Sequence, residues 1–198
     1  MKKFLFVTIL ALLYSLDNKA NDTVSVSYEL PKDAFVLKLM EFQGVYGENV
    51  ILKIPDNNIP FAIYMVISRN GKEERNTIFE GEGGELSKVN NLYFFAKAES
   101  PDTVRISGIG MNIYLPMETK DCILMETYSK NGYTTSDRIP LIAYTNGHKI
   151  KLNVNNETRE IVDYCEVRDA KIHPSEWHDK FDIKEYVYFE IVFSNKKK

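Results

Sequence analysis

The residues best suited to chemistry gather in one short polar stretch near the end of the chain. His173, Glu176, His178 and Asp179 bring imidazole and carboxylate groups, which zinc and similar ions accept as ligands. Their spacing matches no familiar metal site, because two histidines five residues apart lie about 140° from sharing a helical face. We therefore predict no metal and no cofactor, and keep these four residues as weak metal candidates.

The same stretch has the composition of a hydrolytic triad. Ser175, His178 and Asp182 stand three and four residues apart, so on a helix they would share one face. A working triad also needs an oxyanion hole and a base that is held by a separate element. The sequence identifies neither of these parts. We interpret the three residues as a hydrogen-bonded polar face and assign no catalytic residue.

Aromatic side chains offer a second kind of site, because exposed Tyr and Trp can stack on sugars or anchor a protein partner. Trp177 is the only tryptophan, and Tyr186 and Tyr188 alternate with apolar residues in an extended stretch. We predict these three as binding residues. The alternative is that both tyrosines line the semi-exposed face of an antiparallel sheet.

A sheet must position all of these groups. The stretch 185–193 is rich in aromatic and β-branched residues, with Val187, Phe189 and their alternate neighbours on one face. About a dozen such strands are expected, among them 35–42 and 158–167, and Asn-Gly pairs at 70–71 and 146–147 favour hairpin turns.

These patterns together predict an all-β fold, an antiparallel β-sandwich of the immunoglobulin-like or jelly-roll-like kind. One stretch departs from it, because Pro174 suits the first position of a helix and Trp177 and Phe181 stand four residues apart. We expect a short helical turn near 174–182, with its aromatic pair on the sheet.

The first twenty residues have the pattern of a secretory signal peptide, with two lysines directly after Met1, an apolar run from Phe4 to Leu13 and a polar end. No cysteine lies beside the possible cleavage site, so a bacterial lipid anchor is not expected. No later stretch has the pattern of a transmembrane helix. We expect a secreted or periplasmic protein with one domain over 21–198, or two small β domains over 21–100 and 101–198. Asn21 and Asn156 head glycan acceptor triplets that matter only in a eukaryotic secretory pathway.

The chain contains two cysteines, Cys122 and Cys165. In an oxidising compartment an even pair most often forms a disulfide, so we predict a Cys122–Cys165 bridge between two strands. The alternative is a pair of buried free thiols.

The charge balance limits the class of partner. Lys and Arg number 25 against 28 Asp and Glu, a formal net charge of −3. Nucleic acid is not expected as a partner, because phosphate binding needs a surplus of basic residues. Our first hypothesis is a non-catalytic interaction module that binds a protein or a glycan at the cell envelope or exterior. The alternatives are a secreted hydrolase with a site near 173–182, and a structural envelope component. The sequence sets no oligomeric state.

Overall fold

The structure is a computed structural model of the chain and describes residues 23–56, 58–127, 132–154 and 157–194. The expected signal peptide, Asn21 and Asn156 lie outside the described residues. Strands make up 57% of the described residues and helices 15%, which confirms the predicted all-β, sandwich-like fold. None of the described helices has the length and apolar character that a membrane span requires.

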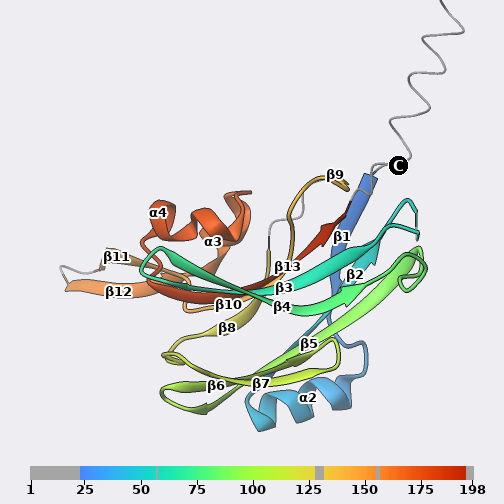
Figure 1. Cartoon of the computed structure of the whole chain (residues 1–198). Helices are drawn as coiled ribbons and strands as arrows, with labels where there is room; N and C mark the ends of the chain where they lie inside the picture. Colours follow the sequence, from blue (N-terminus) through green and yellow to red (C-terminus); the bar gives the residue numbers. More distant parts are fainter. Residues whose placement is uncertain (1–22, 57, 128–131, 155–156, 195–198) are drawn as a thin grey trace, which may run out of the picture.

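Two antiparallel sheets form the body of the molecule (Figure 1). The first sheet has the order β7-β6-β5-β2-β1-β9 and consists of β1 (Thr23–Glu29), β2 (Val45–Lys53), β5 (Val89–Ser100), β6 (Thr103–Gly108), β7 (Met111–Pro116) and β9 (Tyr133–Thr134). The second has the order β4-β3-β13-β10-β8 and consists of β3 (Phe61–Arg69), β4 (Lys72–Gly81), β8 (Ile123–Glu126), β10 (Ile139–Thr145) and β13 (Glu185–Phe193).

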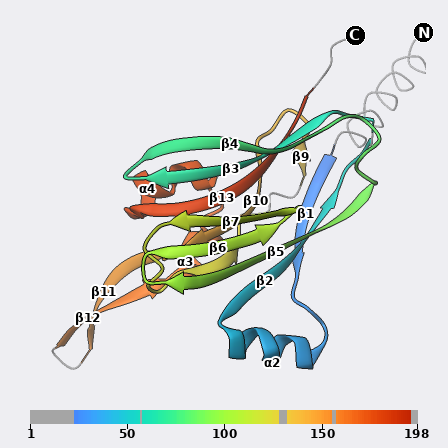
Figure 2. The same cartoon turned by 60° about the horizontal axis from the view of Figure 1, so that its bottom comes forward.

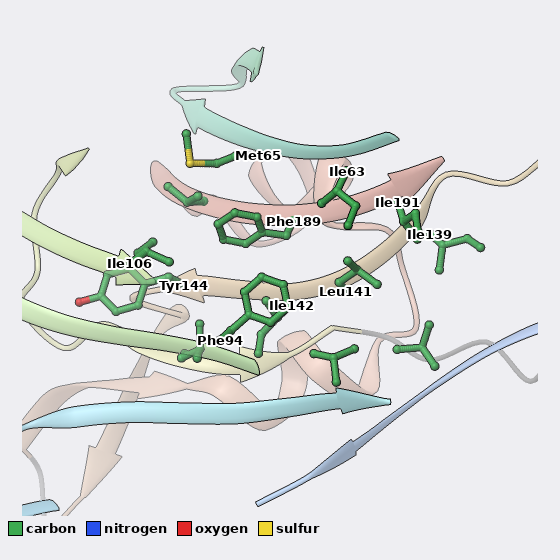
Figure 3. Packing of buried hydrophobic residues seen from close by; sticks show 14 of the residues in the cluster. Ile63, Met65, Phe94, Ile106, Ile139, Leu141, Ile142, Tyr144, Phe189 and Ile191 are labelled. Atoms are coloured by element: carbon green, nitrogen blue, oxygen red, sulfur yellow. The ribbon is translucent and has the colours of Figure 1, made fainter. Parts of the chain in front are cut away.

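The inner faces of the two sheets enclose the main hydrophobic core (Figure 3). Alternate residues of each strand point inward, as the period of two requires. The rings of Phe94 on β5 and Phe189 on β13 meet across the interface with their centroids 5.1 Å apart. Val187 and Ile191 share the inward face of β13, as predicted.

β13 is the central strand of the second sheet, between β3 and β10. Its outer face is also covered, by a layer that contains α3 (Tyr164–Asp169), the 3-10 turn η1 (Pro174–Glu176) and α4 (Trp177–Phe181) (Figure 1). The helical turn predicted near 174–182 is thus present. Trp177 and Phe181 are both buried against the sheet, as expected.

The two Asn-Gly pairs have different outcomes. Asn70 and Gly71 have φ angles of 49° and 75° and join β3 to β4 in the predicted hairpin. Gly147 also has a positive φ, but β10 already pairs with β13 on one side and β8 on the other. The strand after Gly147 therefore finds no free edge on β10 with which to form a hairpin. It becomes β11 (His148–Val154), pairs with β12 (Glu157–Asp163) and projects from the body (Figures 1 and 2).

Two predicted strands are wrong. Residues 35–42 lie in a helix, α2 (Ala34–Gln43), because Asp33 caps the first turn by accepting hydrogen bonds from two backbone N–H groups and Gly44 ends the helix in the left-handed conformation. The predicted strand 158–167 ends early, because the Asp163 carboxylate accepts from the backbone N–H of Glu166 and starts α3.

The turn at residues 101–102, near the alternative domain boundary, lies inside a β-hairpin. It joins β5 to β6, which pair with each other in the first sheet. Each of the two large sheets contains strands from both sides of this turn.

Candidate functional site

The predicted metal candidates do not converge. The Nδ1 atom of His173 lies 2.8 Å from the Ser175 hydroxyl, whereas Nδ1 of His178 lies 3.2 Å from the Ile183 carbonyl oxygen. The ring of His178 packs against Gly71, where a Cβ atom would approach it to 2.6 Å. Within the described residues, no three or more His, Cys, Asp or Glu side chains form a group that could hold a metal ion.

The three residues with triad composition interact with other groups and not with one another. Ser175 bonds His173, His178 bonds the backbone of Ile183, and the Asp182 carboxylate pairs with Lys184. A cavity of about 250 Å³ opens beside this stretch, and its wall includes Arg138, Lys171, His173 and Glu176. Among the described residues, no Ser, Thr or Cys lines this cavity, so none supplies the hydroxyl or thiol nucleophile of a Ser-His-Asp type triad.

The three predicted aromatic binding residues lie inside the molecule. Trp177, Tyr186 and Tyr188 are completely buried, in the cluster between β13 and the helical layer. The Tyr186 hydroxyl donates to the Pro174 carbonyl, which holds η1 against the sheet. These side chains therefore have no exposed surface in this structure with which to contact a partner directly, and the face of β13 that carries the two tyrosines is covered rather than semi-exposed.

The predicted disulfide is also wrong, because both cysteines are free thiols. Cys122 is buried between the sheets, where its thiol donates to the Glu118 carbonyl. Cys165 lies in α3 rather than in a strand and is exposed. Burial, with a smaller contribution from the charge of Glu118, raises the pKa of the Cys122 thiol to about 12, which makes it a poor nucleophile at neutral pH.

A charged network that the sequence analysis did not identify lies beside Tyr188. The Glu190 carboxylate is fully buried on β13 and contacts a guanidinium nitrogen of Arg75 at 2.7 Å and Nε of Arg138 at 3.0 Å. Nε2 of His173 lies 3.5 Å from the same carboxylate. Arg138 also donates to the Tyr188 hydroxyl, which in turn donates to Glu73.

The charges in this network are balanced. Burial alone would raise the pKa of Glu190, but the interactions with His173, Arg138 and Arg75 outweigh it and hold the pKa below its usual value. The guanidinium of Arg75 stacks 3.6 Å from the centre of the Tyr64 ring. The network thus ties the 173–176 segment to the sheet and keeps Glu190 ionised. Glu190, the one charged residue within the apolar run 186–193, was the signal for it in the sequence.

The clearest unusual feature of the surface is helix α2. It has no buried residue, although seven of its ten residues are apolar. Phe35, Leu39 and Phe42 are spaced i, i+4, i+7 and share one face. They expose 75%, 49% and 84% of their surface. We call these three residues the α2 stripe.

α2 lies on the outer side of the six-stranded sheet, away from the second sheet (Figures 1 and 2). It touches that sheet through Met40, whose methyl group occupies the space above Gly47 on β2; a Cβ at Gly47 would lie only 2.4 Å from it. Met40 and Val36 therefore mark the sheet-facing side of the helix, and the α2 stripe is turned away from it.

A groove of about 460 Å³ lies between the sheet, the segment 29–32 and Val36 in the first turn of α2. Its apolar wall consists of Leu30, Val36, Tyr93 and Phe95. Tyr93 and Phe95 point outward from β5, since Phe94 and Ala96 between and beside them are buried in the core. We call the α2 stripe, the groove and these two rings together the α2 face.

Comparison with known proteins adds no family to this description. No protein-family model, no curated protein sequence and no solved structure matches the chain.

Proposed function

We propose that this protein is a non-catalytic interaction module that binds another protein through the α2 face. The observation that carries the proposal is a helix with an apolar, solvent-exposed stripe and no buried residue. A helix that is apolar on most of its sides is normally buried, so an exposed one requires an explanation. The pattern of the N-terminal residues supports a secreted or periplasmic location for this binding.

The area involved is large enough to matter for binding. Aromatic side chains bury about 150–250 Å² each, so Phe35 and Phe42 together leave roughly 300 Å² in water. At about 25 cal/mol per Å², covering these two rings would contribute up to about 7 kcal/mol before the cost of association is subtracted. Patches of several hundred Å² on a monomer are often interaction sites.

The chemistry of the stripe favours a protein over a glycan. Phe35, Leu39 and Phe42 offer no hydrogen-bonding group, whereas a sugar needs polar partners for its hydroxyls. Anchors at i, i+4 and i+7 are typical of a helix that docks into an apolar groove of another protein.

Two other occupants are less well supported. Helices that bind membrane surfaces carry many Lys and Arg on their polar side, but α2 has a single lysine, Lys38, paired with Glu41 at 2.6 Å. A second copy of the chain would carry the same net charge of −3, which opposes self-association.

Photo-crosslinking in the source cells tests the proposal. A photoreactive phenylalanine analogue replaces Phe42, and a matched control places it at Ile161, an exposed apolar residue on the projecting hairpin. We expect one discrete protein adduct from position 42 and none of the same mass from position 161. The partner is then identified by mass spectrometry and purified, and it must protect the amides of α2 from hydrogen exchange.

The other outcomes would overturn the proposal. An adduct with twice the mass of the chain would identify a second copy as the occupant. Flotation of the purified protein with neutral or anionic lipid vesicles, lost on Phe42→Ser, would identify a membrane surface. Saturable binding on a glycan array without any protein adduct would favour a glycan.

A further inference from the structure

The groove beside α2 has a polar floor that the apolar stripe lacks. Asn49 on β2 and Asn91 on β5 both line it and point outward from the sheet. The Nδ2 group of Asn49 donates to Oδ1 of Asn91 at 3.1 Å. This bond leaves Oδ1 of Asn49 buried without a hydrogen-bond partner. Asn91 is the acceptor in this bond, and within the described part of the chain its own Nδ2 group donates to no group.

The groove therefore has one free donor, Asn91 Nδ2, and one unpaired acceptor, Asn49 Oδ1, which is buried beneath the groove surface next to the apolar wall. Buried acceptors in folded proteins are nearly always hydrogen-bonded, so an unpaired one in a groove points to a ligand group that satisfies it. An apolar hollow with a few convergent polar groups is the usual form of a binding pocket, and about 460 Å³ lies within the range of such pockets.

We propose that the groove binds an extended peptide segment of the partner protein. A large apolar side chain of that segment lies between Val36 of α2 and the Tyr93 and Phe95 rings of β5. A backbone C=O of the segment accepts from Asn91 Nδ2, and the Asn49 side chain turns toward the groove so that its Oδ1, buried in the free protein, accepts from a backbone N–H of the segment. This inference rests on the proposed function and specifies the partner surface that contacts the groove.

A peptide fits these groups better than other ligands. The two asparagine groups present an acceptor and a donor side by side, and a peptide backbone offers the complementary donor and acceptor at each residue. A lipid tail offers neither group. An anion would need a free cation, but the one lysine of the lining, Lys32, is 3.6 Å from Glu29.

Nuclear magnetic resonance of the ¹⁵N-labelled protein tests this inference with N-acetyl-L-phenylalaninamide as the probe. Toluene serves as a matched control that keeps the ring and removes the peptide groups. We expect the probe to shift the side-chain amide signals of Asn49 and Asn91 and the backbone signals of Tyr93 and Phe95 in a saturable way. Asn49→Leu should lower the affinity for the probe about tenfold, as expected for one lost hydrogen bond, and leave the affinity for toluene unchanged.

Asn91→Leu, at an exposed position, provides the same test if Asn49→Leu fails to fold. Absence of saturable shifts, or equal affinity for the probe in wild type and in the folded asparagine variant, would overturn the inference. Binding of the purified partner to the variants distinguishes failure of the groove inference from failure of the proposed function. If Phe42→Ala abolishes binding of the partner and the asparagine variants do not affect it, the groove inference is wrong and the interaction module stands. If neither kind of variant affects binding, both are wrong.

Discussion

Replacement of Arg138 by methionine should destabilise the fold through the buried charge of Glu190. The Nε–H group of Arg138 donates to both oxygens of that carboxylate, at 3.0 and 3.2 Å, and a terminal guanidinium nitrogen donates to the Tyr188 hydroxyl. Loss of one partner of a buried ion pair usually costs about 3–5 kcal/mol. Arg75 and His173 still contact Glu190 in the variant, so we expect about 2–3 kcal/mol, measured as the change in the free energy of unfolding in urea.

A second substitution shows whether the cost comes from the charge. Glu190→Gln removes the buried charge, so in the Arg138→Met background it should recover part of the lost stability. The pKa of Glu190 lies below its usual value in the folded protein, so its ion pairs stabilise the fold at neutral pH and this contribution is lost as the pH falls through that lowered pKa. The difference between wild type and Arg138→Met should therefore narrow in acid. A loss below about 0.5 kcal/mol at pH 7, the range of ordinary surface substitutions, would refute the reasoning.

Three further predictions concern separate parts of the fold. A thiol reagent should modify only Cys165 in the native protein and both Cys165 and Cys122 after denaturation without reductant; no reactive thiol in the denatured protein would mean that the disulfide exists after all. Burial and the nearby charge of Glu126 raise the pKa of Glu48 to about 7, so its contribution to stability is complete below about pH 4.5 and is lost as the pH rises to about 7. Glu48→Gln should flatten this part of the stability profile, and an unchanged slope would contradict the assignment. Gly44→Ala should cost about 1 kcal/mol in urea unfolding, because the residue that ends α2 has a φ of 62° and the added methyl group meets no other atom.

Local patterns in the sequence predicted the parts of the fold that depend on neighbouring residues. Alternation in 185–193 placed Val187 and Phe189 on the core face, and the β3–β4 hairpin followed from Asn70-Gly71. The buried pair Trp177 and Phe181 followed from its spacing of four residues.

Helix α2 was missed for a local reason. With seven apolar residues among ten, its sequence satisfies both the period of a strand and the period of a helix. The capping residues Asp33 and Gly44 were the signals that separate the two, and they outweigh the β-propensity of Phe and Val at this point.

The remaining differences depend on contacts between distant segments. Whether Tyr186 and Tyr188 are exposed depends on where α3, η1 and α4 pack, which strand periodicity does not specify. The pairing of Glu190 with Arg75 and Arg138 joins three segments of the chain. The β11–β12 hairpin likewise follows from the fact that both edges of β10 are occupied.

The most direct test of the interaction module is the affinity of its purified partner for three proteins: wild type, Phe35→Ala/Phe42→Ala and Ile161→Ala. The stripe rings and Ile161 are all exposed, so each variant should keep the unfolding free energy of wild type to within about 0.5 kcal/mol. We predict that the stripe variant binds at least about 30-fold more weakly, as expected for interface hot spots, and that Ile161→Ala binds like wild type. Equal affinity of all three folded proteins would contradict the assignment of α2 as the binding surface.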